Sequence, residues 1–212
     1  MKAKILKTFF NKEIKPNLVS QDWICKNHLI YKEIGNSELL RGFCFNSSAF
    51  SITQFEVIAF IQPLYVPCPF IFLTFGQLVK SPENMQWWDY IEDNKAELGE
   101  KLANYINQID DNFLSKVTNA DLFYRVFKND KQISLAHFES VAYSACFADN
   151  LNSANEIAEL KKYISQKEDM RKPYVNDIYM RTLEIEKTLG SREGLQELFN
   201  KWLSETKKAL KL

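Results

Sequence analysis

Apolar residues recur with two periods along this chain: about two between residues 23 and 80, and about 3.6 in residues 3–15 and again after residue 81. An opening stripe over residues 3–15 predicts a helix that ends at Lys15-Pro16, because proline disfavours helical geometry in the residue before it. Strand-forming residues then fill 23–34 and 39–46, with the turn signal Gly35-Asn36-Ser37 between them. This pattern predicts a β-hairpin.

Residues 43–79 contain one charged residue, Glu56, and two runs of strand-forming residues, 55–66 and 70–78. We expect both runs to be central strands, joined by a loop at the prolines of residues 63–69. The alternative is a transmembrane helix, because residues 57–79 carry no charge over 23 positions. The prolines, two glutamines and the absence of flanking Lys or Arg clusters favour the strands, so no membrane contact is expected.

Helical periodicity dominates the chain after residue 95. Ser134 is a candidate N-cap for a helical hairpin that Asp149-Asn150 divides into two helices. Gly190 separates two further amphipathic helices. The helical stripes cover residues 98–113, 121–127, 134–165, 174–189 and 192–210.

These elements predict an α+β fold, an antiparallel sheet of four to five strands with an N-terminal helix, followed by an all-helical C-terminal half. We place a sheet domain at residues 1–130 and a helical extension at residues 131–212. The extension is expected to pack on the sheet domain as one globular unit.

The balance of charge limits the partners that the chain can have. Lys plus Arg and Asp plus Glu both total 27, so the formal net charge is zero and no nucleic-acid partner is expected. Charge is uneven in the middle, where residues 81–130 hold 10 acidic and 5 basic groups, a net of −5. The N-terminus lacks an apolar stretch of signal-peptide length, so we expect a cytoplasmic protein.

Few residues are suited to catalysis, since the chain has two histidines and six glycines. It contains no phosphate-binding glycine loop and no G-x-S-x-G elbow. The four cysteines are 19, 24 and 78 positions apart, which gives no metal or redox motif. We therefore expect no catalytic residue, metal or cofactor. The alternative is a small hydrolase or transferase whose site is assembled from distant residues, with Cys68 and either His28 or His137 as candidates.

The most unusual local feature is an aromatic and acidic segment between Met85 and Asp93. Two interpretations are open. The segment is either a lid that packs its tryptophans over the edge of the sheet, or a surface that binds another protein, because Trp and Tyr are enriched at interaction hot spots. The candidate partner-binding residues are Trp87, Trp88, Asp89, Tyr90, Glu92 and Asp93.

The order of the elements resembles that of bacterial families described as domains of unknown function. The likeness rests on a helix ending at Lys15-Pro16, a strand opening at Trp23, an uncharged sheet closing at Leu73-Thr-Phe-Gly76, and a Trp-rich turn before the helices. It covers about residues 3–130, implies fold more than activity and transfers no functional residue. Some proteins of this general kind look like immunity or regulatory partners in bacterial conflict systems.

The missing catalytic templates, the acidic aromatic segment and a helical hairpin suited to partner contact together favour one class of function. We expect a non-catalytic protein-binding or regulatory module whose partner is another protein.

Overall fold

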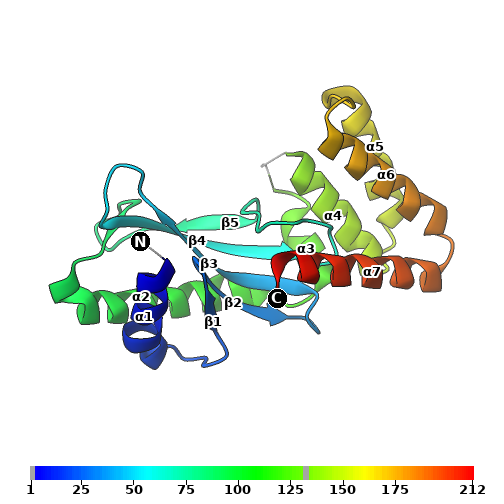
Figure 1. Cartoon of the computed structure of the whole chain (residues 1–212). Helices are drawn as coiled ribbons and strands as arrows, with labels where there is room; N and C mark the ends of the chain where they lie inside the picture. Colours follow the sequence, from blue (N-terminus) through cyan, green and yellow to red (C-terminus); the bar gives the residue numbers. More distant parts are fainter. Residues whose placement is uncertain (1–2, 131–133) are drawn as a thin grey trace. The chain divides into compact units, whose positions relative to one another are not determined.

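The structure is a computed structural model that describes residues 3–130 and 134–212. The chain forms two compact units (Figure 1). The sheet unit contains residues 1–34, 40–62 and 75–116, and the helical unit contains residues 35–39, 63–74 and 117–212. Each unit is therefore built from three separate stretches of chain.

An antiparallel sheet forms the centre of the sheet unit, with its strands in the order β1-β2-β3-β4-β5. The short strand β6 also pairs with β4, so β4 has β3 along one edge and shares its other edge between β5 and β6. From Ala59 onward β4 is buried on both faces. The strands are β1 (Ile24–Lys26), β2 (Leu29–Ile34), β3 (Leu39–Ser47), β4 (Gln54–Pro63), β5 (Gly76–Val79) and β6 (Trp88–Asp89).

The second predicted pair of strands exists, but both strands are shorter than the sequence pattern indicates. β4 ends at Pro63 and β5 begins only at Gly76. Proline cannot donate to a sheet ladder, so the chain leaves the sheet there. Leu64, Tyr65 and Val66, which follow β4 directly, are still buried, because they belong to the core of the helical unit. There the Tyr65 and Ser144 hydroxyl oxygens lie 2.6 Å apart.

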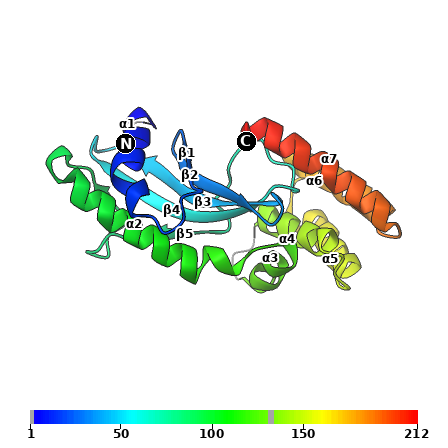
Figure 2. The same cartoon turned by 90° about the horizontal axis from the view of Figure 1, so that it is seen from below.

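The predicted N-terminal helix is present and changes its winding part of the way along. α1 (Ala3–Phe9) continues into a π-helical turn (Phe10–Ile14) and then a 3₁₀ turn (Lys15–Asn17). Figures 1 and 2 show this segment beside the first half of α2 (Lys95–Asn112), which runs along the sheet. Short 3₁₀ turns precede and follow α2, at Glu92–Asn94 and Leu114–Lys116. A π turn widens the helix locally, and here it brings Glu13 against Gly99 of α2.

We expect Gly99→Ala to destabilise the sheet unit, because the added methyl group would lie 2.5 Å from the Cβ atom and 2.7 Å from the carbonyl oxygen of Glu13. The free energy of unfolding should fall by about 1–3 kcal/mol, as for other overpacked sites. Urea denaturation followed by circular dichroism measures this change. Gly190→Ala is the control, since nothing lies within 4 Å of its added methyl group. Equal stability of the two variants would contradict the close approach.

The helical unit contains five α-helices among its described residues, and successive helices contact one another from α3 to α7. Polar side chains cap three of them: Asn119, Ser134 and Ser191 each accept a hydrogen bond from a backbone N–H of the first turn. The predicted cap at Ser134 is thus confirmed. The helices are α3 (Ala120–Phe127), α4 (Leu135–Phe147), α5 (Ser153–Lys167), α6 (Pro173–Thr188) and α7 (Arg192–Leu210).

Aromatic side chains fill the core of the helical unit. Tyr65 stacks on Phe147 with ring centroids 4.2 Å apart, and Phe199 meets both rings edge-on. Tyr143 stacks on Trp202 at 5.6 Å. Tyr65 comes from the stretch before the helices, so residues 63–74 supply part of this core.

The predicted fold class is confirmed in its N-terminal helix, its antiparallel sheet and its helical second half. The last change from the sheet unit to the helical unit along the chain falls between residues 116 and 117, and the domain boundary at 130 and 131 stays a prediction. α3 belongs with the later helices because it packs on α4. In the described part of the chain, no helix has both the length and the apolar character needed to cross a bilayer.

Candidate functional site

The aromatic and acidic segment lies beside the turn that joins β3 to β4. In the pairing of β6 with β4, Asp89 lies opposite Gln54 and Trp88 lies opposite Phe55. The backbone N–H of Tyr90 donates to the carbonyl oxygen of Thr53 at 2.9 Å. The segment is therefore fixed to the base of the β3–β4 turn.

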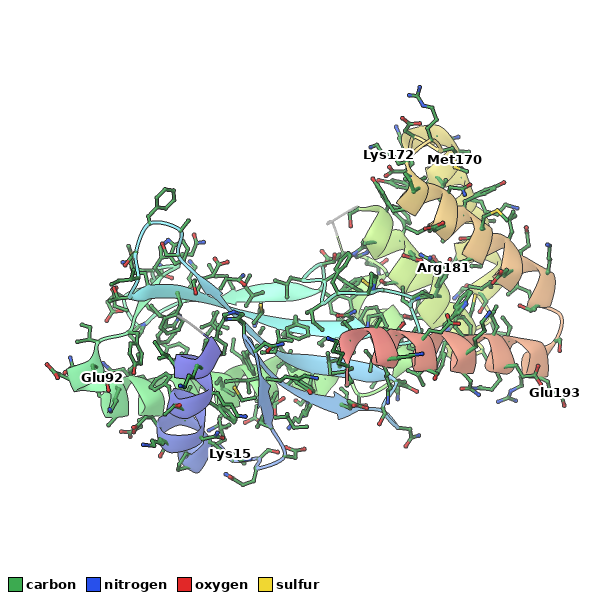
Figure 3. The ribbon with its side chains drawn as sticks, viewed as in Figure 1. Lys15, Glu92, Met170, Lys172, Arg181 and Glu193 are labelled. Carbon is green, nitrogen blue, oxygen red and sulfur yellow. The ribbon has the colours of Figure 1, made fainter. Side chains whose placement is uncertain are left out.

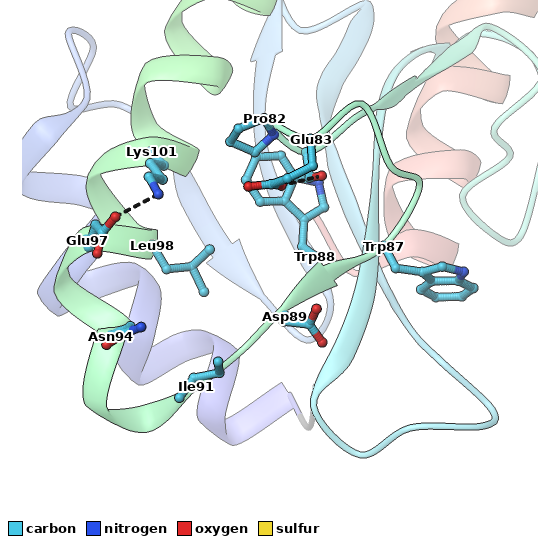
Figure 4. Close-up of a pocket in the computed structure, with 11 residues that line it drawn as sticks. Pro82, Glu83, Trp87, Trp88, Asp89, Ile91, Asn94, Glu97, Leu98 and Lys101 are labelled. Carbon is cyan, nitrogen blue, oxygen red and sulfur yellow. Dashed lines mark hydrogen bonds and ion pairs between the residues drawn. The ribbon is translucent and has the colours of Figure 1, made fainter.

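The two tryptophans have different environments: Trp88 is the first residue of β6, and Trp87 lies just before the strand. Trp88 is 2% exposed, its Nε1–H donates to the carbonyl oxygen of Val79 at 2.8 Å, and its ring meets Tyr105 edge-on. Figure 4 shows the Trp88 indole directed toward α2 and the Trp87 indole directed away from it. Trp87 is half-buried, so it is the tryptophan that a partner can reach.

The remaining predicted residues combine exposure with local contacts. Tyr90 is half-buried, packs edge-on against Phe9 and donates from its hydroxyl to Glu92 at 2.7 Å. Burial and the neighbouring Glu92 raise the pKa of Tyr90 to about 12. Hydrogen bonds from Lys95 and Tyr90 lower the pKa of Glu92, which stays exposed. Asp89 and Asp93 are also exposed.

A hollow of about 260 Å³ separates this segment from α2 (Figure 4). Leu98 and Ile91 give it an apolar wall, and Glu97 pairs with Lys101 at 2.7 Å on its rim. Neither of these two ionic groups is buried, so the pair is solvated and contributes little energy.

The β3–β4 turn carries two large apolar side chains that sequence reasoning missed. Phe50 is 98% exposed and Ile52 is 97% exposed. Ser48 and Ser51 hold the turn in place, since their hydroxyl oxygens accept hydrogen bonds from the backbone N–H groups of Phe50, Thr53 and Gln54. Phe50 and Ile52 lie in the long uncharged stretch of the sequence, where an exposed apolar residue looks the same as a core residue. We call Phe50, Ile52, Trp87 and Asp89 the tip surface.

A second feature lies wholly within the helical unit, as a cavity of about 340 Å³ between residues 66–72, α4 and α6. Its lining is mostly apolar, but Glu139 of α4 and Arg181 of α6 form an ion pair there. Nε and Nη2 of Arg181 both donate to Oε1 of Glu139, at 3.2 and 2.7 Å. Figure 3 locates Arg181 on α6. Burial raises the pKa of Glu139 despite the nearby guanidinium.

The surroundings of Cys68 do not favour the enzyme alternative. Cys68 lines the cavity, but its thiol donates to the carbonyl oxygen of Phe70 at 3.1 Å, and burial raises its pKa, which disfavours the nucleophilic thiolate. His137 shares the helical unit with Cys68, whereas His28 belongs to the sheet unit. Burial lowers the pKa of His137. Across residues 3–130 and 134–212, no group of three or more His, Cys, Asp or Glu side chains is placed to hold a metal ion.

Comparison with protein-family models, with curated proteins and with solved structures found no match for this chain. The resemblance to bacterial families of unknown function therefore brings no residue role to it. The tip surface and the cavity of the helical unit are the two features of this chain that point to a function.

Proposed function

We propose that this protein is a non-catalytic binding module that contacts another protein through the tip surface. The observation that carries the proposal is the nearly complete exposure of two large apolar side chains, Phe50 and Ile52, on one turn. Single exposed apolar residues are ordinary, but two large ones on the same ordered turn favour an interaction site. Trp87 and Asp89 extend the same region, because β6 is paired with the start of β4.

The turn is suited to binding because its backbone is already ordered. Backbone N–H groups of the turn donate to the Ser48 and Ser51 hydroxyl oxygens. The Ser48 N–H also donates to the carbonyl oxygen of Gln54, and together these bonds fix the conformation of the turn. A binding loop that is ordered before association loses less conformational entropy when the complex forms. Phe50 and Ile52 can then enter an apolar pocket without rearrangement of the turn.

The charges next to the turn define the chemistry of the partner. Asp89, Glu92 and Asp93 are exposed acids. Asp89 lies in β6, which pairs with β4, and Glu92 and Asp93 follow β6 in the sequence. They favour a partner whose apolar pocket has a rim of Lys and Arg side chains. Such a contact should form more slowly as the salt concentration rises, because salt screens exposed charges.

The free cysteines favour a reducing cellular compartment for this function. All four cysteines are unpaired. Reduced thiols persist in reducing compartments, so we place the proposed contact in the cytoplasm.

We expect the double variant Phe50→Ala, Ile52→Ala to bind the partner at least about tenfold more weakly, because each lost apolar contact is worth about 1.5–3 kcal/mol when fully buried. The partner is first isolated from a lysate of the source organism on immobilised protein. It is then purified, so that calorimetry gives the Kd between two pure proteins.

Leu151→Ala is the matched control, since Leu151 is also fully exposed but lies on the helical unit. It should leave the Kd unchanged. The melting temperatures of all variants should agree, because none of the three side chains is buried. An unchanged Kd for the double variant, or retention of no protein by the native chain, would overturn the proposal.

A further inference from the structure

The cavity of the helical unit has the composition of a small-molecule site. Its volume of about 340 Å³ is at the lower end of the range for ligand pockets, and most of its lining is apolar. Phe70, Phe72 and Tyr174 supply aromatic side chains, and Ile178 of α6 adds an aliphatic one. An apolar body of bicyclic size can occupy such a space.

Two polar atoms at the cavity have hydrogen-bonding capacity left over. Ser140 is 1% exposed, and no described residue forms a hydrogen bond with its hydroxyl group. An unpartnered buried hydroxyl costs free energy, so a native fold usually satisfies it or uses it. The adjacent Glu139 accepts both bonds from Arg181 on Oε1, and no hydrogen bond reaches Oε2 from the residues described.

The charges of the lining select against anions. Glu139 and Arg181 cancel, because each carries one charge of opposite sign within 2.7 Å. Asp177 is a further, exposed acid in the lining, so the formal sum is −1 (−1 for Glu139, +1 for Arg181 and −1 for Asp177). A carboxylate or phosphate would meet this excess of negative charge. A neutral donor group would instead complete the bonding of Glu139.

We propose that this cavity binds a compact, uncharged apolar molecule with a carboxamide or alcohol head group, which donates a hydrogen bond to Glu139 and bonds to the Ser140 hydroxyl. The site lies in the helical unit, and the tip surface lies in the sheet unit. The two binding activities are therefore tested separately.

The experiment titrates the full chain with 2-naphthamide and, in parallel, with 2-naphthoate, which has the same rings and an anionic head. Calorimetry and the chemical shifts of the protein report binding. We expect saturable binding of 2-naphthamide and binding of 2-naphthoate that is at least tenfold weaker.

Two variants place the binding in this cavity. Ser140→Ala removes only the unpartnered hydroxyl and should weaken 2-naphthamide binding about tenfold. Ala136→Leu adds bulk to the lining and should abolish saturable binding. Ser165→Ala, an exposed serine of α5, is the control and should bind as the native chain does.

Three results would overturn the proposal. These are no saturable binding of 2-naphthamide, equal affinity for 2-naphthoate, and native affinity in both cavity variants. Melting curves of each variant show that it is folded, and if one of the two does not fold, the other decides the outcome. Binding of the protein partner at the tip surface is expected to be the same in all these variants.

Discussion

Trp88→Ala should lower the free energy of unfolding of the sheet unit by about 3–5 kcal/mol, the usual cost of truncating a fully buried aromatic residue. Trp88 is 2% exposed, and the variant also leaves the carbonyl oxygen of Val79 without the indole N–H that it accepts at 2.8 Å. Trp87→Ala should cost about 1 kcal/mol or less, because the Trp87 ring is only half-buried. Urea denaturation followed by far-ultraviolet circular dichroism compares the two variants.

This pair of neighbouring residues separates the two interpretations of the aromatic segment. If Trp88→Ala lowers the free energy of unfolding strongly and Trp87→Ala lowers it only slightly, the segment is part lid and part accessible surface. Similar losses for the two variants would contradict the different environments of the two indoles. In either case, partner binding has to be tested on Phe50, Ile52 and Trp87, since Trp88→Ala would change stability and binding together.

Asp110→Ala should destabilise the sheet unit by about 3–5 kcal/mol, because it leaves two buried cations without their shared anion. Lys32 Nζ lies 3.3 Å from the Asp110 carboxylate and Arg41 Nη2 lies 3.2 Å from it. The side chains of Lys32 and Arg41 are only 7% and 10% exposed. Asp22, the other acid near Lys32, is 64% exposed and cannot replace Asp110.

The next residue in the sequence provides the control. Asp111 is exposed on the same helix, so Asp111→Ala should change stability by no more than about 0.5 kcal/mol. Chemical denaturation at low and high salt measures both variants. The loss for Asp110→Ala should persist at high salt, because salt screens buried pairs only weakly. A loss that disappears at high salt, or one equal to that of Asp111→Ala, would refute this account of the cluster.

The sequence predicted the helices well wherever one apolar stripe faces one core. The stripes at 174–189 and 192–210 correspond closely to α6 and α7, because Gly190 interrupts an otherwise regular period. The N-terminal stripe predicted a helix but not its π turn. That turn lies against Gly99, which is far from it in the sequence, so a local pattern does not reveal the close approach.

The predicted strand bounds were wrong where an apolar run packs into a different core from the one expected. Residues 64–66 have the composition of a strand, yet they are buried in the helical unit. The apolar content of a segment indicates that it is buried, but it does not indicate against which partner.

The candidate sites show the same limit. The segment around Trp87 was visible in the sequence as a cluster of unusual composition, while the burial of Trp88 depends on the pairing of β6 with β4. The Glu139–Arg181 pair joins residues 42 positions apart, and no local pattern marks either of them. Charge and polarity at such sites become informative only once the helices are packed.

The interleaving of the two units has a consequence for how the chain is made. Residues 35–39 and 63–74 leave the ribosome before any of α3 to α7 has been synthesised, although those helices are their packing partners. Leu64 and Tyr65 must therefore remain unburied in the nascent chain while the sheet unit is being completed. A gene fragment encoding only residues 131–212 would also lack the Tyr65 side chain that stacks on Phe147. No single continuous gene fragment could therefore encode the whole helical unit without also encoding part of the sheet unit.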